Sequence, residues 1–208
     1  WVPPANGPDG QPLLDALIVG GGMCGQTAAF ALLREGVRNL RCVDRAPRGR
    51  EGPWATYARM EILRSPKHLT GPDYGVPSLT YRAWHEAKFG AAHWDKLHKI
   101  ARLDWADYLL WVRDTAGLPV ENEFEVVALN LRKEFVEVKT RTSTLHARKV
   151  VLALGREGSG ALRWPRDSEP LSGDGPAKNK TIPAGREAEF VAIVRETRKL
   201  LRPLARVD

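Results

Sequence analysis

Three glycines near the start of the chain constrain its fold more than any other feature. Gly20, Gly22 and Gly25 have the GxGxxG spacing, and the apolar run Ala16–Val19 directly precedes them. In a strand–turn–helix unit, the first glycine permits the tight turn and the second lets a pyrophosphate approach the backbone. The third lets the helix and strand pack closely, and the helix directs its free N–H groups at the phosphates. The motif therefore predicts a turn that binds a dinucleotide.

The flanking sequence completes a βαβ unit around this turn. Thr27–Glu35 is rich in alanine and leucine and predicts a helix that Gly36 can end. Asn39–Val43 predicts a second strand, and Asp44 stands at its end, where a carboxylate can accept hydrogen bonds from a ribose. The unit is interpreted as binding an adenine dinucleotide, and a glycine-rich turn without a ligand is the alternative.

The composition narrows the class of protein. The chain has 208 residues, of which 43% are hydrophobic, and this is enough for one domain with a core. No apolar run approaches the roughly 20 residues of a membrane-spanning helix, which argues against a membrane protein. Two cysteines do not make a disulfide framework, so we expect a reducing, cytoplasmic setting. The net charge of +7 is not gathered into a basic cluster with interleaved aromatics, and no histidine spacing indicates a metal, so neither nucleic acid nor a metal ion is expected.

A turn-rich loop follows the second predicted strand and returns the chain to the nucleotide. The loop is Gly49–Trp54, and its tryptophan either stacks on a flavin ring or anchors the loop to the core. Three cations follow it, Arg59, Arg64 and Lys67, which either contact phosphates or a flavin ring or are solvated loop charges.

A helical excursion occupies the middle of the chain. Tyr81–Phe89 predicts a helix that Ser78 or Thr80 can cap and Gly90 can end. Asp104 is expected to cap the next helix. The apolar face of that helix is expected to contain Trp105, Tyr108, Leu109, Val112 and Ala116.

From Pro119 the hydrophobic pattern changes from helical spacing to alternation. Phe124–Leu131, Phe135–Arg141 and Thr144–His146 predict a small antiparallel meander. Lys149–Gly155 is an apolar strand ending in glycine, typical of a central parallel strand that returns to the nucleotide sheet. A βαβ unit, a helical excursion, a meander and a return strand together predict an α/β fold, and this layout resembles the FAD domain of two-dinucleotide flavoproteins.

Five segments in this order also carry a more specific resemblance. They are Gly20–Gly25, Asp44, Gly52–Trp54, Leu63–Lys67 and Ala153–Gly155. Together they resemble the FAD half of the flavin-containing monooxygenase-like oxidoreductases, over about residues 15–165. The second loop is similar to that family's Gly-Gly-x-Trp signature, and the last segment is similar to its Ala-Thr-Gly end, with Leu154 in place of threonine.

The resemblance implies a fold, a cofactor and a reaction. The fold is a Rossmann-like FAD-binding domain. NADPH reduces FAD, and a flavin peroxide transfers one oxygen atom to a small-molecule substrate. The cofactor performs the hard chemistry while the protein orients it and excludes water, so no catalytic side chain is named. The predicted cofactor-binding residues are Gly20, Gly22, Gly25, Asp44, Trp54 and Lys67.

The pattern departs from the family after the return strand. No strand followed by a second GxGxxG, which the family uses for NADPH, comes after Gly155. The predicted domains are a linker at 1–12, an FAD-binding domain at 13–165, a flexible linker at 166–185 and an amphipathic helix at 186–208. This tail helix is expected to dock on the core or to meet a protein partner, a second copy or a membrane surface.

The missing motif leaves the enzymatic role open at this stage. One hypothesis is a flavin-dependent oxidoreductase completed by further residues or by a partner, with an ending that reflects truncation or a shifted reading frame. A second is a non-catalytic FAD-binding module. A third is a NAD-binding Rossmann domain, in which Asp44 disfavours NADP because a carboxylate repels a 2′-phosphate.

Overall fold

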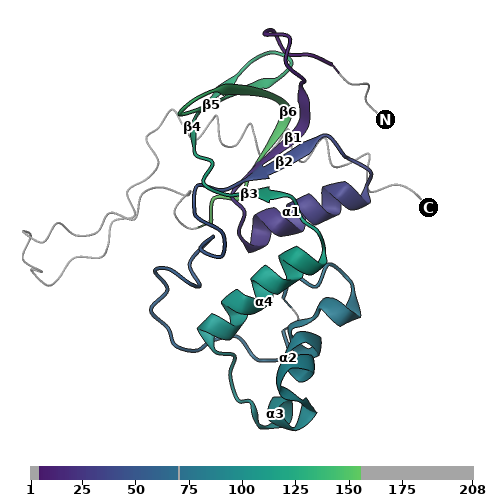
Figure 1. Ribbon diagram of the computed structural model, residues 1–208, viewed down its shortest axis with the longest axis vertical. Helices are drawn as coiled ribbons and strands as arrows, with labels where there is room; N and C mark the ends of the chain where they lie inside the picture. Colours follow the sequence, from purple (N-terminus) through teal and green to yellow (C-terminus); the bar gives the residue numbers. More distant parts are fainter. Residues whose placement is uncertain (1–4, 70, 156–208) are drawn as a thin grey trace, which may run out of the picture. The chain divides into compact units, whose positions relative to one another are not determined.

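The computed structural model of the chain describes residues 5–69 and 71–155. These residues form an α/β unit around one six-stranded sheet in the order β3-β2-β1-β6-β5-β4 (Figure 1). The strands are β1 (Leu14–Val19), β2 (Leu40–Val43), β3 (Val120–Glu121), β4 (Val126–Leu131), β5 (Val136–Thr140) and β6 (Thr144–Leu152). The helices are α1 (Met23–Arg34), α2 (Tyr81–Phe89), α3 (Ala91–Lys96) and α4 (Arg102–Thr115), with a 3₁₀ turn at Pro77–Leu79.

In the parallel half of the sheet, the carboxyl ends of β1, β2, β3 and β6 lie on the same side. β1 pairs in parallel with β2 on one side and with β6 on the other, and β2 pairs in parallel with β3. The N–H of Gly20 donates to Val43, and the N–H of Ala153 donates to Val19, each at 2.8 Å. The glycine turn therefore lies at the carboxyl ends of the parallel strands, which is where nucleotides bind in sheets of this type.

The predicted antiparallel meander is confirmed as β4, β5 and β6, and it is continuous with the parallel half of the sheet. The segments expected as Thr144–His146 and Lys149–Gly155 are joined in the single strand β6, which ends at Leu152. β6 pairs antiparallel with β5 and parallel with β1, so one strand joins the two halves. One edge of β6 pairs with β1 and the other with β5. The hydrophobic pattern of the sequence does not show which strand pairs at each edge.

Helix α1 lies between the sheet and the helical excursion. Its Ala29 is fully buried beside Ile18 and Cys42 of the sheet. On another side, its Phe30 stacks on Tyr74 of the excursion with ring centroids 4.3 Å apart. Burial on two sides explains why α1 is alanine- and leucine-rich and why its first turn is held in one position against the sheet.

Most of the helix ends predicted for the helical excursion are confirmed. Thr80 caps α2 by accepting a hydrogen bond from the N–H of Ala83 at 3.2 Å, and Gly90, at φ +87°, ends the helix. The prediction that Asp104 caps α4 was wrong, because Ala101 is the N-cap and Asp104 lies in the first turn, where the helix dipole favours it. The short elements α3 and β3 were not predicted, since six and two residues carry little periodicity.

The apolar face of α4 forms the centre of the excursion's core. Four of its predicted members, Trp105, Tyr108, Leu109 and Val112, are at most 7% exposed. The hydroxyl of Tyr108 donates to the carbonyl oxygen of Leu79 at 2.7 Å, which satisfies a buried polar group.

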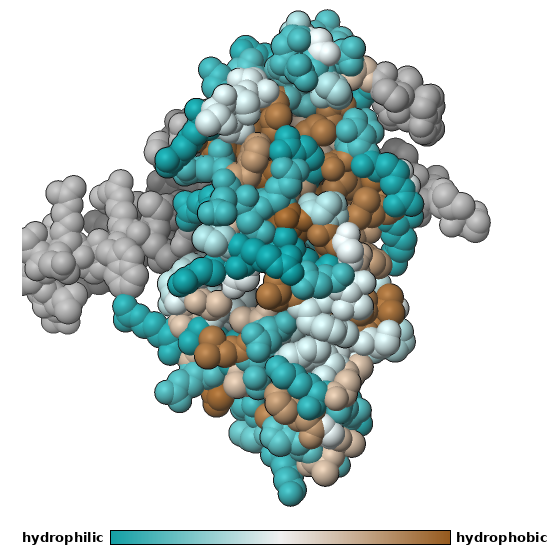
Figure 2. Space-filling view, in the orientation of Figure 1, coloured by the Kyte–Doolittle hydropathy of each residue, from teal (hydrophilic) through white to brown (hydrophobic). Residues whose placement is uncertain are grey.

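The visible surface is mostly hydrophilic, with exposed apolar residues over the sheet. Figure 2 shows teal residues over most of one face and brown residues gathered over the sheet. On the edge strand β4, Val127 and Leu131 are 54% and 59% exposed. An exposed apolar edge is a surface available to further protein. Within the described residues, no helix has the length and apolarity needed to cross a membrane, and the predicted helix at 186–208 lies outside them.

A buried histidine gives the excursion a pH dependence. His85 is fully buried, and its Nε2 lies 3.3 Å from Nδ1 of His93. Burial, and then the neighbouring imidazole of His93, lower the pKa of His85 below its ordinary value of 6.5. Asp104 and Glu86 oppose this change and Lys67 adds to it. The unfolded chain therefore binds this proton more readily than the folded chain, and stability is lost as the pH falls below about 6.5.

We expect the free energy of unfolding to be smaller at about pH 5.5 than at about pH 7.5. Denaturant unfolding at the two pH values measures this difference. The His85→Gln variant should show a smaller difference, because its amide does not titrate. An identical pH dependence in the variant and the wild type would contradict the assignment to His85.

Candidate functional site

The first and third glycines of the motif are required by the backbone itself. Gly20 has φ +110°, and a Cβ there would lie 2.3 Å from the carbonyl oxygen of Ala153. A Cβ on Gly25 would lie 1.7 Å from the carbonyl oxygen of Gly20. Both obstacles are backbone atoms, which cannot move aside as the end of a flexible side chain can. The two positions bring α1, β1 and the chain after β6 together as the motif predicts.

The second glycine is different, because nothing in the chain requires it. Gly22 has φ −72° and ψ −171°, an extended conformation open to any residue. A Cβ added to it would meet no atom of the described residues within 4 Å. The surface beside Gly22 is open, which is the condition for close approach of a group from outside the chain.

The N-terminus of α1 offers hydrogen-bond donors at this open surface. The first hydrogen bond of the helix runs from the N–H of Gln26 to the carbonyl of Gly22 at 2.9 Å. Gly22, as the N-cap, supplies no side-chain acceptor, and the first turn holds no acidic residue. The N–H groups before Gln26 thus have no acceptor within the helix, and together with the helix dipole they favour an anion.

Asp44 lies beside the turn with its carboxylate already oriented. Its Oδ2 accepts a hydrogen bond from the N–H of Gly21 at 2.7 Å, and its Oδ1 accepts one from the N–H of Ala46 at 2.8 Å. A carboxylate has about four lone-pair sites, so acceptor capacity remains for a hydroxyl group. Gly21, which the motif does not include, is also constrained, because a Cβ there would lie 2.4 Å from Val120.

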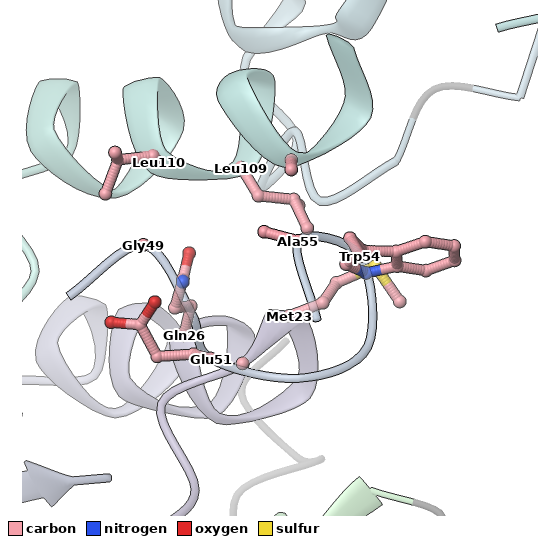
Figure 3. A pocket seen from close by; sticks show the side chains of 10 residues that line it. Met23, Gln26, Gly49, Glu51, Trp54, Ala55, Leu109 and Leu110 are labelled. Carbon is pink, nitrogen blue, oxygen red and sulfur yellow. The ribbon is translucent and has the colours of Figure 1, made fainter. Parts of the chain in front are cut away.

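A cleft opens between the start of α1, the loop after β2, and α4 (Figure 3). It encloses about 330 Å³ of space, open solvent included. Figure 3 shows the loop passing between the two helices, with Trp54 at one end of the cleft and Gln26 and Glu51 toward the other. The lining residues are Gly22, Met23, Gln26, Gly49, Glu51, Trp54, Ala55, Ala106, Leu109 and Leu110.

The remaining predicted site residues, Trp54 and Lys67, also hold parts of the chain together. Trp54 lines the cleft, and its ring lies edge-on to Trp105 with centroids 6.2 Å apart, so the tryptophan anchors the loop as well. Lys67 donates from Nζ to the carbonyls of Trp94 at 2.6 Å and Asp95 at 3.3 Å, both in α3. Lys67 is thus not among the residues that line the cleft. A flavin contact stays a prediction for both side chains.

Sequence reasoning missed a buried polar network that holds the loop. Nη1 of Arg113 lies 2.6 Å from Oε1 of Glu51, and these side chains are 5% and 6% exposed. Nη2 of Arg113 donates to the carbonyl of Val120 at 2.7 Å and to Asn122 at 2.9 Å. Asn122 in turn donates to Glu51 at 2.5 Å and to the carbonyl of Ala46 at 2.9 Å. The network ties the loop to α4 and β3, and no short motif could reveal it because its members lie far apart in the sequence.

Comparison with known proteins identifies the family of this chain. The FAD-NAD(P)-binding family matches residues 17–157. An FAD-dependent urate hydroxylase of Xanthomonas campestris pv. campestris is 46% identical over 173 residues, which are 79% of this chain and 35% of the relative. The chain thus spans about a third of the length of that relative.

Solved structures share the fold at lower identity. A flavin monooxygenase mutant of Stenotrophomonas maltophilia has a TM-score of 0.53 and 23% identity, over 67% of this chain and 37% of that one. A bacillithiol disulfide reductase of Staphylococcus aureus has a TM-score of 0.51 and 18% identity, over 68% of this chain and 38% of that one. These two likenesses concern the fold alone. The family match and the relative confirm the resemblance found in the motifs, and the chain belongs to the FAD-NAD(P)-binding family.

Proposed function

We propose that this chain binds FAD across the glycine turn. We further propose that the protein uses the bound flavin and NADPH to insert one oxygen atom into a small organic substrate. The observation that carries the proposal is the open surface at Gly22, between two glycines that the backbone requires. A packing role explains Gly20 and Gly25, but it does not explain Gly22.

The described residues fit the parts of FAD. The open backbone at Gly22 and the N–H groups of the first turn of α1, which have no acceptor within the helix, suit the pyrophosphate. Asp44, held by two backbone N–H groups, suits the hydroxyls of the adenosine ribose. The same carboxylate would repel the 2′-phosphate of NADPH, so we place NADPH at another site.

When bound, FAD would supply the redox chemistry that couples oxidation of NADPH by O₂ to insertion of one oxygen atom into the substrate, the other oxygen atom leaving as water. The role of this chain is to position the flavin and to shield it. Met23, Leu109 and Leu110 give the cleft apolar walls, which keep water away from a bound group.

The relatives favour oxygenation over other reactions of this fold. A disulfide reductase shares the fold at 18% identity, so the fold alone does not select the reaction. The relative described as an FAD-dependent urate hydroxylase is 46% identical, and this supports hydroxylation with urate as the first substrate to test.

We also propose a cytoplasmic location, since both cysteines are free thiols, with Cys24 exposed and Cys42 buried. The predicted helix at 186–208 remains a candidate contact for a protein partner or a second copy.

The purified chain is expected to carry the visible absorbance of a bound flavin. NADPH added without oxygen should bleach this absorbance if the hydride-donor site is present, and urate should accelerate NADPH consumption if urate is the substrate. A colourless chain that binds NADH but not FAD would contradict the proposal. A yellow chain that NADPH does not bleach would indicate a flavin-binding module without turnover.

A further inference from the structure

The buried amide of Gln26 is a polar group of the cleft that the described chain leaves incomplete. Gln26 is 4% exposed, and its Nε2 donates to the carbonyl oxygen of Gly21 at 2.9 Å. Its Oε1 is buried and has no hydrogen-bond partner within residues 5–69 and 71–155. Buried acceptors without a donor are rare in folded proteins, so this oxygen needs an explanation.

The hydrogen bond to Gly21 fixes which end of the Gln26 amide is the nitrogen. The two ends of a glutamine amide are assigned from their hydrogen-bond partners. Exchanging Oε1 and Nε2 would place an oxygen against the carbonyl of Gly21, which is itself an acceptor. Nε2 therefore stays on Gly21. Figure 3 shows the amide of Gln26 extending from α1 into the cleft, in the direction of Gly49 and α4.

None of the other lining residues donates a hydrogen bond to this oxygen within the described residues. Glu51 is an acceptor, and its carboxylate is bound by Arg113 and Asn122. Met23 and Leu109, on opposite sides of the cleft, have no side-chain hydrogen-bond donor. The cleft thus combines apolar walls with a buried acceptor that lacks a donor among the described residues, and this chemistry suits a ligand that carries a hydroxyl group.

We propose that Oε1 of Gln26 accepts a hydrogen bond from a hydroxyl of the ribityl chain of FAD. The inference rests on the proposed function, because it places the pyrophosphate at Gly22. Gly22 borders the cleft, whereas Gly21 contacts Asp44, so the two sides of the turn suit the two halves of the cofactor. Gln26 comes four residues after Gly22, about 6 Å along the helix, within reach of the group attached to the second phosphate.

Titrations of the chain with FAD and with ADP test this role. ADP contains the adenosine and pyrophosphate but lacks the ribityl chain. The Gln26→Leu variant is expected to bind FAD about five- to tenfold more weakly, as for one lost hydrogen bond, and to bind ADP as the wild type does. Thr27→Val is the matched control on the same helix. Its exposed hydroxyl donates to the carbonyl of Met23, and its loss should change neither affinity.

The outcomes separate this inference from the proposal on which it rests. A wild-type chain that binds no FAD defeats the proposed function and the inference with it. Unchanged FAD affinity in Gln26→Leu, or an equal loss for FAD and ADP, overturns the inference alone. If that variant does not fold, the wild type is tested with an FAD analogue whose ribityl chain lacks hydroxyls. Binding as tight as that of FAD overturns the inference, and weaker binding supports it.

Discussion

Replacing Gly22 by valine is expected to weaken FAD binding by at least about 100-fold, or about 2.7 kcal/mol, while the chain still folds. The new side chain would occupy the open surface where the pyrophosphate must approach the backbone. Its Cβ meets no atom of the described residues within 4 Å, so the Cβ itself causes no clash that opposes folding. Valine is a poorer N-cap than glycine but restricts the unfolded chain, and these opposing effects keep the change in stability within about 1 kcal/mol.

Gly25→Ala is the matched variant in the same motif, and its main effect should be on the stability of the fold. Its Cβ would lie 1.7 Å from the carbonyl oxygen of Gly20, and the loss of stability should exceed about 4 kcal/mol. Flavin content by absorbance and denaturant unfolding of the cofactor-free chain measure the two effects. Wild-type flavin content in Gly22→Val would place the pyrophosphate elsewhere.

Replacing Arg113 by methionine is expected to destabilise the chain by about 3–5 kcal/mol. The variant leaves the carboxylate of Glu51 buried and without its cation, and the side chains are only 5% and 6% exposed. The loop after β2 loses its tie to α4, so FAD affinity should fall as well. Denaturant unfolding measures the first effect and FAD titration the second.

Arg48→Met offers a control for this second prediction. Arg48 pairs with Asp114 at 2.6 Å, but the two side chains are 53% and 48% exposed. Water solvates the remaining carboxylate of Asp114 in the variant, so the loss should stay below about 1 kcal/mol. Equal losses in the two variants would show that the buried network does not hold the loop.

Local features of the sequence were enough to predict β1, α1, β2 and the glycine turn that follows β1. The GxGxxG spacing, the caps at Thr80 and Gly90 and the apolar face of α4 depend on residues within a few positions of one another. Backbone angles and helical period are set over such short distances, so these features can be read along the chain. Long apolar strands such as β1 were recognised for the same reason.

Contacts between distant segments were decided only by the tertiary structure. The pairing of β6 with both β1 and β5 merged two predicted strands into one. The ion pair of Glu51 and Arg113 joins residues 62 positions apart, and Lys67 is held by carbonyls of the α3 segment, outside the cleft lining. Hydrogen bonds and burial at such positions depend on which surfaces pack together. The sequence alone therefore determined where the glycine turn lies, whereas packing decided which groups surround it and which, like Oε1 of Gln26, have no partner among the described residues.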